Sequence, residues 1–144
     1  MIFRSSNKKA NLEGSFNRPN RPFFAAGACH ILAHALLTKL DEELWYAVFI
    51  EPKLNFSGMH VFVTNGIIVL DYHGTTAHET YIEHYVSKMQ RFFPGWQCSF
   101  KRLKISTIGK DFCDMYKHRM PDQYYRDPLP RAYEYATKLL GDHA

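Results

Sequence analysis

Two adjacent residues, Asn65 and Gly66, constrain the fold of this chain more than any other feature. An Asn-Gly pair between two β-rich runs is a strong hairpin signal, because a type I′ turn needs positive φ at both central positions. The flanking runs, residues 59–64 and 67–72, have the alternating, β-branched character of strands. The sequence therefore predicts a hairpin with a two-residue loop, in which Thr64 pairs with Ile67.

This register places His60 directly opposite Asp71, on the same face of the hairpin. Directly opposed Cβ atoms are about 4.5–5.5 Å apart, so the carboxylate can accept a hydrogen bond from the imidazole. The rest of that face is apolar, and a carboxylate there costs free energy unless it is paired. The pair suits a general base whose ring is oriented by a carboxylate. The alternative is a structural pair whose partners only satisfy each other.

Cys29 is the candidate nucleophile, because it lies near the start of a predicted helix over residues 25–40. A helix N-terminus lowers the pKa of a thiol and offers backbone amides that can bind an oxyanion. At 100° per residue Cys29 lies at the centre of an apolar stripe, so we expect it to face the body of the protein. The stripe consists of Leu32, Ala33, Leu36 and Leu40. Cysteine on such a stripe is also a common core residue, and that alternative stays open.

The remaining patterns complete an α+β fold. The sequence predicts an N-terminal helix packed on a mainly antiparallel sheet, with further C-terminal helices and a single domain over residues 23–144. Residues 1–22 are expected to form a flexible basic arm. Further strands are expected at 44–50 and 97–105, and further helices at 76–93, at about 108–118 and at 131–140, the last with Gly141 at its C′ position.

The composition of the chain limits the compartments and partners that we expect for it. The chain has 144 residues, a net charge of +4 and three cysteines, an odd number that does not suit a disulfide framework and favours a reducing compartment. The sequence has no apolar run long enough for a membrane span and no apolar segment of a secretory signal. We therefore expect a cytoplasmic protein, or one exported without a classical signal peptide, and no membrane partner. No nucleic-acid motif accompanies the basic arm, so we expect no nucleic-acid partner.

Three stretches carry a resemblance to a known superfamily: GACHILAHALL (27–37), HVFV (60–63) and IIVLDYHG (67–74). They resemble the papain-like cysteine enzymes, most of all the transglutaminase-like and NlpC-type members. The resemblance covers roughly residues 25–75. It implies a Cys29–His60–Asp71 triad on a helix and two adjacent strands. Papain has a glutamine oxyanion donor six residues before the cysteine, where this chain has Phe23; Asn20, or a backbone amide near Ala28, is the expected substitute.

The sequence thus predicts an enzyme that transfers acyl groups from an amide bond, acting as a peptidase, amidase, deamidase or transglutaminase-like protein without a cofactor or metal. The expected partner is a peptide or protein substrate, and an effector role is an analogy only. Two alternatives stay open. One is a zinc-binding protein that uses His30 and His34, which are spaced i, i+4. The other is a non-catalytic module that binds protein or nucleic acid.

Overall fold

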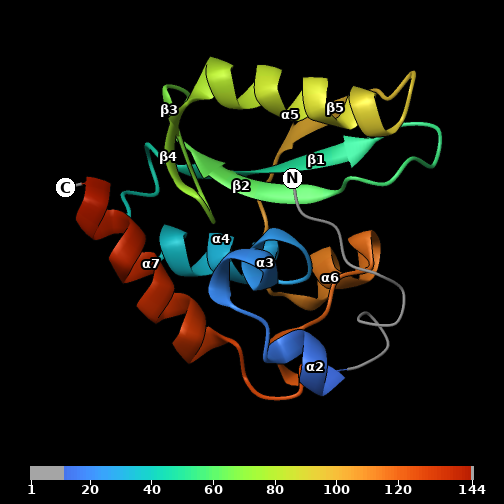
Figure 1. Ribbon diagram of the computed structural model, residues 1–144. Coiled ribbons are helices and arrows are strands. Elements are labelled where there is room, and N and C mark those ends of the chain that lie inside the picture. The colour runs from blue at the N-terminus through green and yellow to red at the C-terminus, as the bar shows by residue number, and fades with distance from the viewer. Residues whose placement is uncertain (1–11, 144) are drawn as a thin grey trace.

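The computed structural model describes residues 12–143 and has an α+β fold, as the sequence predicts (Figure 1). The sheet contains β1 (Tyr46–Pro52), β2 (His60–Thr64), β3 (Ile68–Asp71), β4 (Gly74–Ala77) and β5 (Cys98–Arg102). The helices are α2 (Leu12–Phe16), α3 (Asn20–Ala25), α4 (Cys29–Leu37), α5 (His78–Phe92), α6 (Lys110–Tyr116) and α7 (Leu129–His143), with a 3₁₀ turn at Pro121–Gln123.

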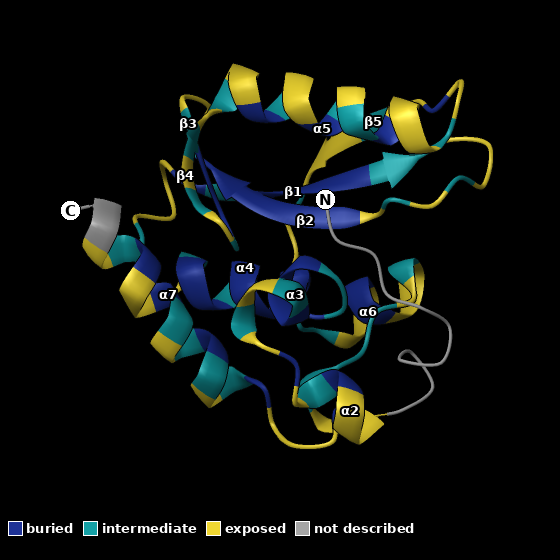
Figure 2. Cartoon of the chain, in the orientation of Figure 1, coloured by how far each residue is buried: buried dark blue, intermediate teal, exposed yellow. Residues whose placement is uncertain are grey.

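The five strands are antiparallel and lie in the order β4-β3-β2-β1-β5. Helix α5 covers one face, and α3, α4, α6 and α7 lie on the other (Figure 1). The central strand β2 is buried along its whole length (Figure 2). Alternate side chains of β2 therefore enter two separate cores: Val61 and Val63 pack toward α4, whereas Phe62 packs toward α5. The edge strand β5 exposes Lys101 and Arg102.

The β2–β3 hairpin forms, but its predicted register is wrong by two residues. Thr64 pairs with Val69 rather than with Ile67. The side chain of Asn65 explains the shift, because its Oδ1 accepts hydrogen bonds from the amides of Ile67 and Ile68, each at 2.9 Å. The turn is therefore centred one residue later than predicted, and only Gly66 needs a positive φ, of 90°.

The predicted irregular arm is wrong for residues 12–22, which include α2 and the start of α3; residues 1–11 lie outside the described part of the chain. Arg131 of α7 holds this segment. Its Nε donates to Asn20 Oδ1 at 2.6 Å, and its two terminal nitrogens donate to the carbonyls of Phe16 and Arg18. The guanidinium also lies 4.2 Å from the ring centroid of Phe23. The N-terminal helices are thereby attached to the C-terminal one.

Three other boundaries differ from prediction. The helix expected from residue 25 begins at Cys29, because Gly27 adopts φ 134° and separates α3 from α4. The sequence analysis missed β4 and assigned its last two residues, Thr76 and Ala77, to the helix that follows. Helix α7 continues through Gly141, so this glycine does not end it. No helix within residues 12–143 has the length and apolar character needed to cross a bilayer.

Candidate active site

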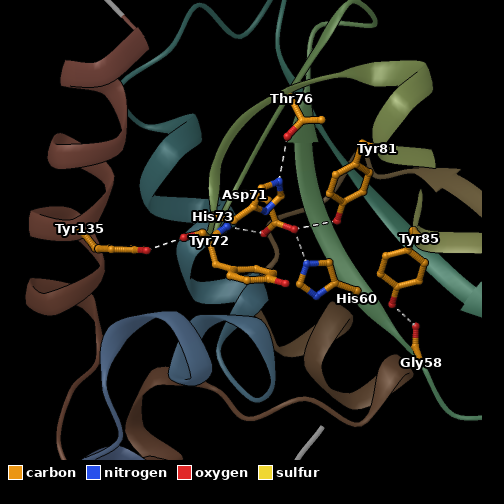
Figure 3. Close-up of polar contacts among 9 residues, drawn as sticks. All are labelled: Gly58, His60, Asp71, Tyr72, His73, Thr76, Tyr81, Tyr85 and Tyr135. Carbon is orange, nitrogen blue, oxygen red and sulfur yellow. Dashed lines mark hydrogen bonds and ion pairs between the residues drawn. The ribbon is translucent and has the colours of Figure 1, made fainter. Parts of the chain in front are cut away.

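His60 and Asp71 form a buried pair, as the sequence predicts (Figure 3). His60 Nε2 lies 2.6 Å from Asp71 Oδ2, and the two residues are 3% and 2% exposed. Asp71 also accepts hydrogen bonds from the Tyr81 hydroxyl at 2.7 Å and from the Tyr72 amide at 2.8 Å. The carboxylate is thus fixed by three donors, from β2, from the turn after β3 and from α5. Since Nε2 is used by Asp71, the other ring nitrogen of His60 is left for a second partner.

The Cys29 thiol is the candidate for that second partner, because Cys29 and His60 each shift the pKa of the other. Cys29 is the first residue of α4, where the chain leaves the left-handed Gly27 and enters the helix. It is 5% exposed and lies in the core between α4 and the sheet. The Cys29 sulfur and the His60 ring make a polar contact that shifts the pKa of both groups. The structure therefore brings together the three residues that the sequence proposed as a triad.

The electrostatics of this contact favour a thiolate–imidazolium pair. Burial raises the pKa of the Cys29 thiol, but the charge of His60 and polar contacts with the rings of His118, His30 and His60 outweigh burial and lower it well below its ordinary value. Burial lowers the pKa of His60, but the charges of Asp71 and Cys29 raise it to about 10. These opposite shifts favour a proton on His60 and a thiolate at Cys29, which is the form of cysteine that reacts as a nucleophile.

The backbone of α4 offers a candidate oxyanion donor, whereas one of the two candidates from the sequence, the amide of Ala28, already has an acceptor. The side chain of Asn20 accepts a hydrogen bond from Arg131, and the amide of Ala28 donates to the carbonyl of Phe23 at 3.2 Å. The first amides of a helix have no acceptor within the helix. The amide of Cys29 itself is such a group, and it lies beside the sulfur that would attack a carbonyl.

No protein-family model, curated protein or solved structure matches this chain. The functional assignment therefore depends on the geometry of the site itself.

Two further histidines lie beside the sulfur, and the sequence indicated neither in this role. One nitrogen each of His30 and His118 lies, with Cys29 Sγ, in a group whose members are all within 4.8 Å of one another. His30 Nε2 donates to the carbonyl of Arg119 at 2.6 Å, and His118 Nδ1 donates to the carbonyl of Tyr116 at 2.9 Å. In its neutral form each ring would carry its lone pair on its other nitrogen, and only in its protonated form would it donate a hydrogen bond to the Cys29 thiolate.

His118 could not be found from sequence, because it is distant from α4 in the chain and belongs to no motif. The sequence paired His30 with His34, as possible zinc ligands, and not with Cys29. It is fully buried, and its Nδ1 is the one buried side-chain nitrogen or oxygen without a hydrogen-bond partner in the described part of the chain. Burial also lowers the pKa of His30, which keeps this ring neutral.

The other candidate groups lie elsewhere. His34 contacts the Tyr133 hydroxyl of α7 at 3.3 Å and does not belong to the Cys29 group. Burial raises the pKa of Cys98, although Lys53 opposes it, and burial together with Asp114 raises the pKa of Cys113. Only Cys29, of the three thiols, is shifted toward the thiolate.

Proposed function

We propose that this chain is a cysteine-dependent enzyme that transfers the acyl group of an amide bond in a peptide or protein. The observation that carries the proposal is the juxtaposition of Cys29, with its lowered pKa, and a histidine fixed by a buried carboxylate. Burial of both His60 and Asp71 excludes water that would compete for their hydrogen bond. A pair that served stability alone would need no thiol at the free nitrogen of His60.

The chemical steps follow from these positions. The Cys29 thiolate adds to the carbonyl carbon of the substrate, and the new oxyanion binds the Cys29 amide. The carbon–nitrogen bond then breaks, and His60 gives its proton to the leaving amine. Water, or an amine in a transfer reaction, next attacks the thioester while His60 takes its proton. Collapse releases the acyl product and restores the thiolate and imidazolium, with Asp71 holding the ring throughout.

A second candidate function, metal binding, is favoured by a separate observation. A thiolate and two imidazoles are typical zinc ligands, and a histidine ligand commonly donates its other N–H to a backbone carbonyl, as His30 and His118 both do. The orphaned Nδ1 of His30 fits such a ligand. The structure thus groups His30 with His118 and Cys29, rather than with His34, as the set that could hold an ion. An ion there would occupy the sulfur and prevent acyl transfer.

Alkylation by iodoacetamide distinguishes the two functions. In a Cys98→Ser/Cys113→Ser background only Cys29 can react, and acyl-transfer chemistry predicts rapid modification with a pH midpoint below about 7. The His60→Ala variant should react at least about tenfold more slowly at neutral pH, because its thiol is no longer ionised by an imidazolium. A midpoint near that of an ordinary thiol, unaffected by His60→Ala, contradicts the proposal. Slow alkylation that a chelator accelerates, with stoichiometric zinc by metal analysis, supports the second candidate instead.

A further inference from the structure

A pocket of about 450 Å³ opens beside His60, between α3 and α5. This volume falls within the usual range of small-ligand sites. Its walls come from α3, from the β3–β4 turn and from one side of α5, and His60 contributes to its lining. Ala25, four residues before Cys29, lies at its border. A group bound there would lie next to the base that serves the reacting carbonyl.

The inner surface of the pocket is aromatic and fixed. Tyr81 and Tyr85 are buried, and their hydroxyls donate to Asp71 at 2.7 Å and to the carbonyl of Gly58 at 2.6 Å. The ring of Tyr85 stacks on His60 with 6.1 Å between centroids. Figure 3 shows both tyrosines on the same side of the His60–Asp71 pair. Because these hydroxyls are already used, the rings offer the pocket apolar surface for a short aliphatic stem.

The rim of the pocket is basic. Besides His60, four of its lining residues carry basic groups, and none of the lining residues carries a carboxylate. The four are Arg21, His73, His84 and Lys88. Helix α5 presents Thr80, His84 and Lys88, which are spaced four residues apart, on the pocket side, while Glu79 and Glu83 are absent from the lining. Within residues 12–141, the ion pairs of the structure involve none of the four basic residues.

The positive charge of the rim acts on the pKa of neighbouring ionisable groups. Burial lowers the pKa of His73, and the charges of His60, Arg21 and His84 lower it further, although Asp71 opposes them. Arg21 also acts to lower the pKa of Tyr72, although burial and Asp71 raise it on balance. Asp71 does not line the pocket, and its two oxygens are bonded to His60, Tyr81 and the backbone.

We propose that this pocket binds the carboxylate of an acidic side chain, so that the enzyme prefers amide bonds next to aspartate or glutamate. The assignment of the substrate rests on the proposed function, whereas binding of the carboxylate does not. The stem of such a side chain packs on the tyrosine rings, and its carboxylate reaches the rim, where Arg21 can form a bidentate pair and Lys88 adds a point charge. The complementary rim also favours encounter with acidic substrates at low salt.

Two alkylating reagents test the pocket beside the nucleophile. Iodoacetate and iodoacetamide react by the same displacement, but only the former carries a carboxylate. In the Cys98→Ser/Cys113→Ser background we expect the iodoacetate/iodoacetamide rate ratio for Cys29 to fall about fivefold or more in Arg21→Gln/Lys88→Gln. The matched control Lys39→Gln removes an exposed charge in the turn after α4, outside the pocket, and should leave the ratio unchanged. An equal ratio in all three proteins contradicts the proposal.

Direct binding tests the pocket without any reaction at Cys29. Three probes are compared by titration: N-acetyl-glutamate amide, with a side-chain carboxylate; N-acetyl-glutamine, with an α-carboxylate; and neutral N-acetyl-glutamine amide. We expect the first to bind at least about tenfold more tightly than the third, and Arg21→Gln/Lys88→Gln to abolish this preference. Tighter binding of the second probe, or equal binding of all three, overturns the proposal. If Cys29 proves unreactive while the first probe still binds selectively, the proposed enzymatic function fails and the carboxylate pocket stands.

Discussion

His60 and Asp71 share a hydrogen bond of 2.6 Å although they do not lie directly opposite each other across the hairpin. Continuing the observed register from Thr64–Val69 places Asp71 opposite Phe62. His60, two residues before Phe62 in β2, is therefore a diagonal neighbour of Asp71. Because side chains alternate along a strand, a shift by two residues leaves both on the same face, and long side chains bridge the diagonal.

Replacing Asp71 should affect both stability and reactivity. Asp71→Ala removes three hydrogen bonds and leaves the buried His60 charge without its partner, for which we expect a loss of about 3–5 kcal/mol in the free energy of unfolding. Urea denaturation measures this loss. Asp71→Asn keeps the shape of the side chain and should fold, but we expect its acyl-transfer rate to fall by about 10²–10⁴ because the ring of His60 is no longer held in the right tautomer.

The control for this prediction is Tyr81→Phe. It removes one donor to Asp71 but leaves the ion pair, so the expected cost is about 1 kcal/mol. Equal stability losses in Asp71→Asn and Tyr81→Phe, together with unchanged reactivity, would show that the carboxylate does not orient His60.

The stability of the protein should respond to pH in a way that depends on Cys29. The pKa of His60 is raised to about 10, so its contribution is complete below about 6.5 and is lost as pH rises toward 10. Burial raises the pKa of Cys29, but His60 lowers it more, so the contribution of the thiolate is lost as pH falls and is complete only above the ordinary thiol pKa. Between pH 7 and 9, therefore, the contribution of His60 to stability falls as pH rises, while the contribution of Cys29 increases.

Cys29→Ala removes the contribution of Cys29 that increases with pH and leaves the contribution of His60 that falls with pH. Its free energy of unfolding should therefore fall as pH rises from 7 to 9, whereas that of the wild type should stay closer to constant. Chemical denaturation at several pH values measures both curves. Parallel curves would mean that Cys29 and His60 do not form an ion pair in the folded protein.

Gly58 should tolerate no side chain, because it holds the loop before β2 against α5. Its φ is 112°, and an added Cβ would lie 2.3 Å from Met89 Cε, which is buried. Gly74 is a matched control, since its φ is 113° but nothing lies within 4 Å of an added Cβ. Both alanine variants carry the same backbone strain. We expect Gly58→Ala to be less stable than Gly74→Ala by about 1–3 kcal/mol in urea denaturation, the cost of overpacking. Equal losses would mean that Met89 moves aside freely.

Arg131→Lys should loosen the N-terminal helices. A lysine cannot reproduce the three hydrogen bonds to Asn20 Oδ1 and to the carbonyls of Phe16 and Arg18. Because bonds from a charged donor contribute about 1.5–3 kcal/mol each, we expect a loss of at least about 2 kcal/mol. Limited proteolysis should cut residues 12–22 faster in this variant. Arg126→Lys, at an exposed arginine, is the control and should change stability by less than about 0.5 kcal/mol.

The sequence predicted the parts of the site that depend on periodicity. Alternation along the two strands is sufficient to place His60 and Asp71 on one face. The prediction of the pair was therefore correct although the predicted register was wrong by two residues. The register itself depends on the Asn65 side chain, which accepts hydrogen bonds from two amides of the turn. The preference of Asn-Gly for a two-residue hairpin turn does not include that interaction. Similarly, the helical pattern located Cys29 near a helix start, but Gly27 determined where the helix begins.

The parts that the sequence missed depend on contacts between distant segments. His118 reaches Cys29 because the segment after α6 packs against His30 of α4. The pocket combines α3, the β3–β4 turn and α5, and its basic character arises from residues that are scattered along the chain. Strand β4 has small and polar residues, and its pairing with β3 outweighs their weak intrinsic preference for a strand.

The exposed lysine and arginine on β5 have a consequence for the behaviour of this protein in concentrated solution. An edge strand offers unpaired backbone groups to which a strand of another molecule can add, and such addition starts aggregation. A strand that added beside β5 would have to bring its own side chains against Lys101 and Arg102, and an identical strand would bring the same positive charges. This edge should therefore resist self-association, most strongly at low ionic strength, where repulsion between like charges is least screened.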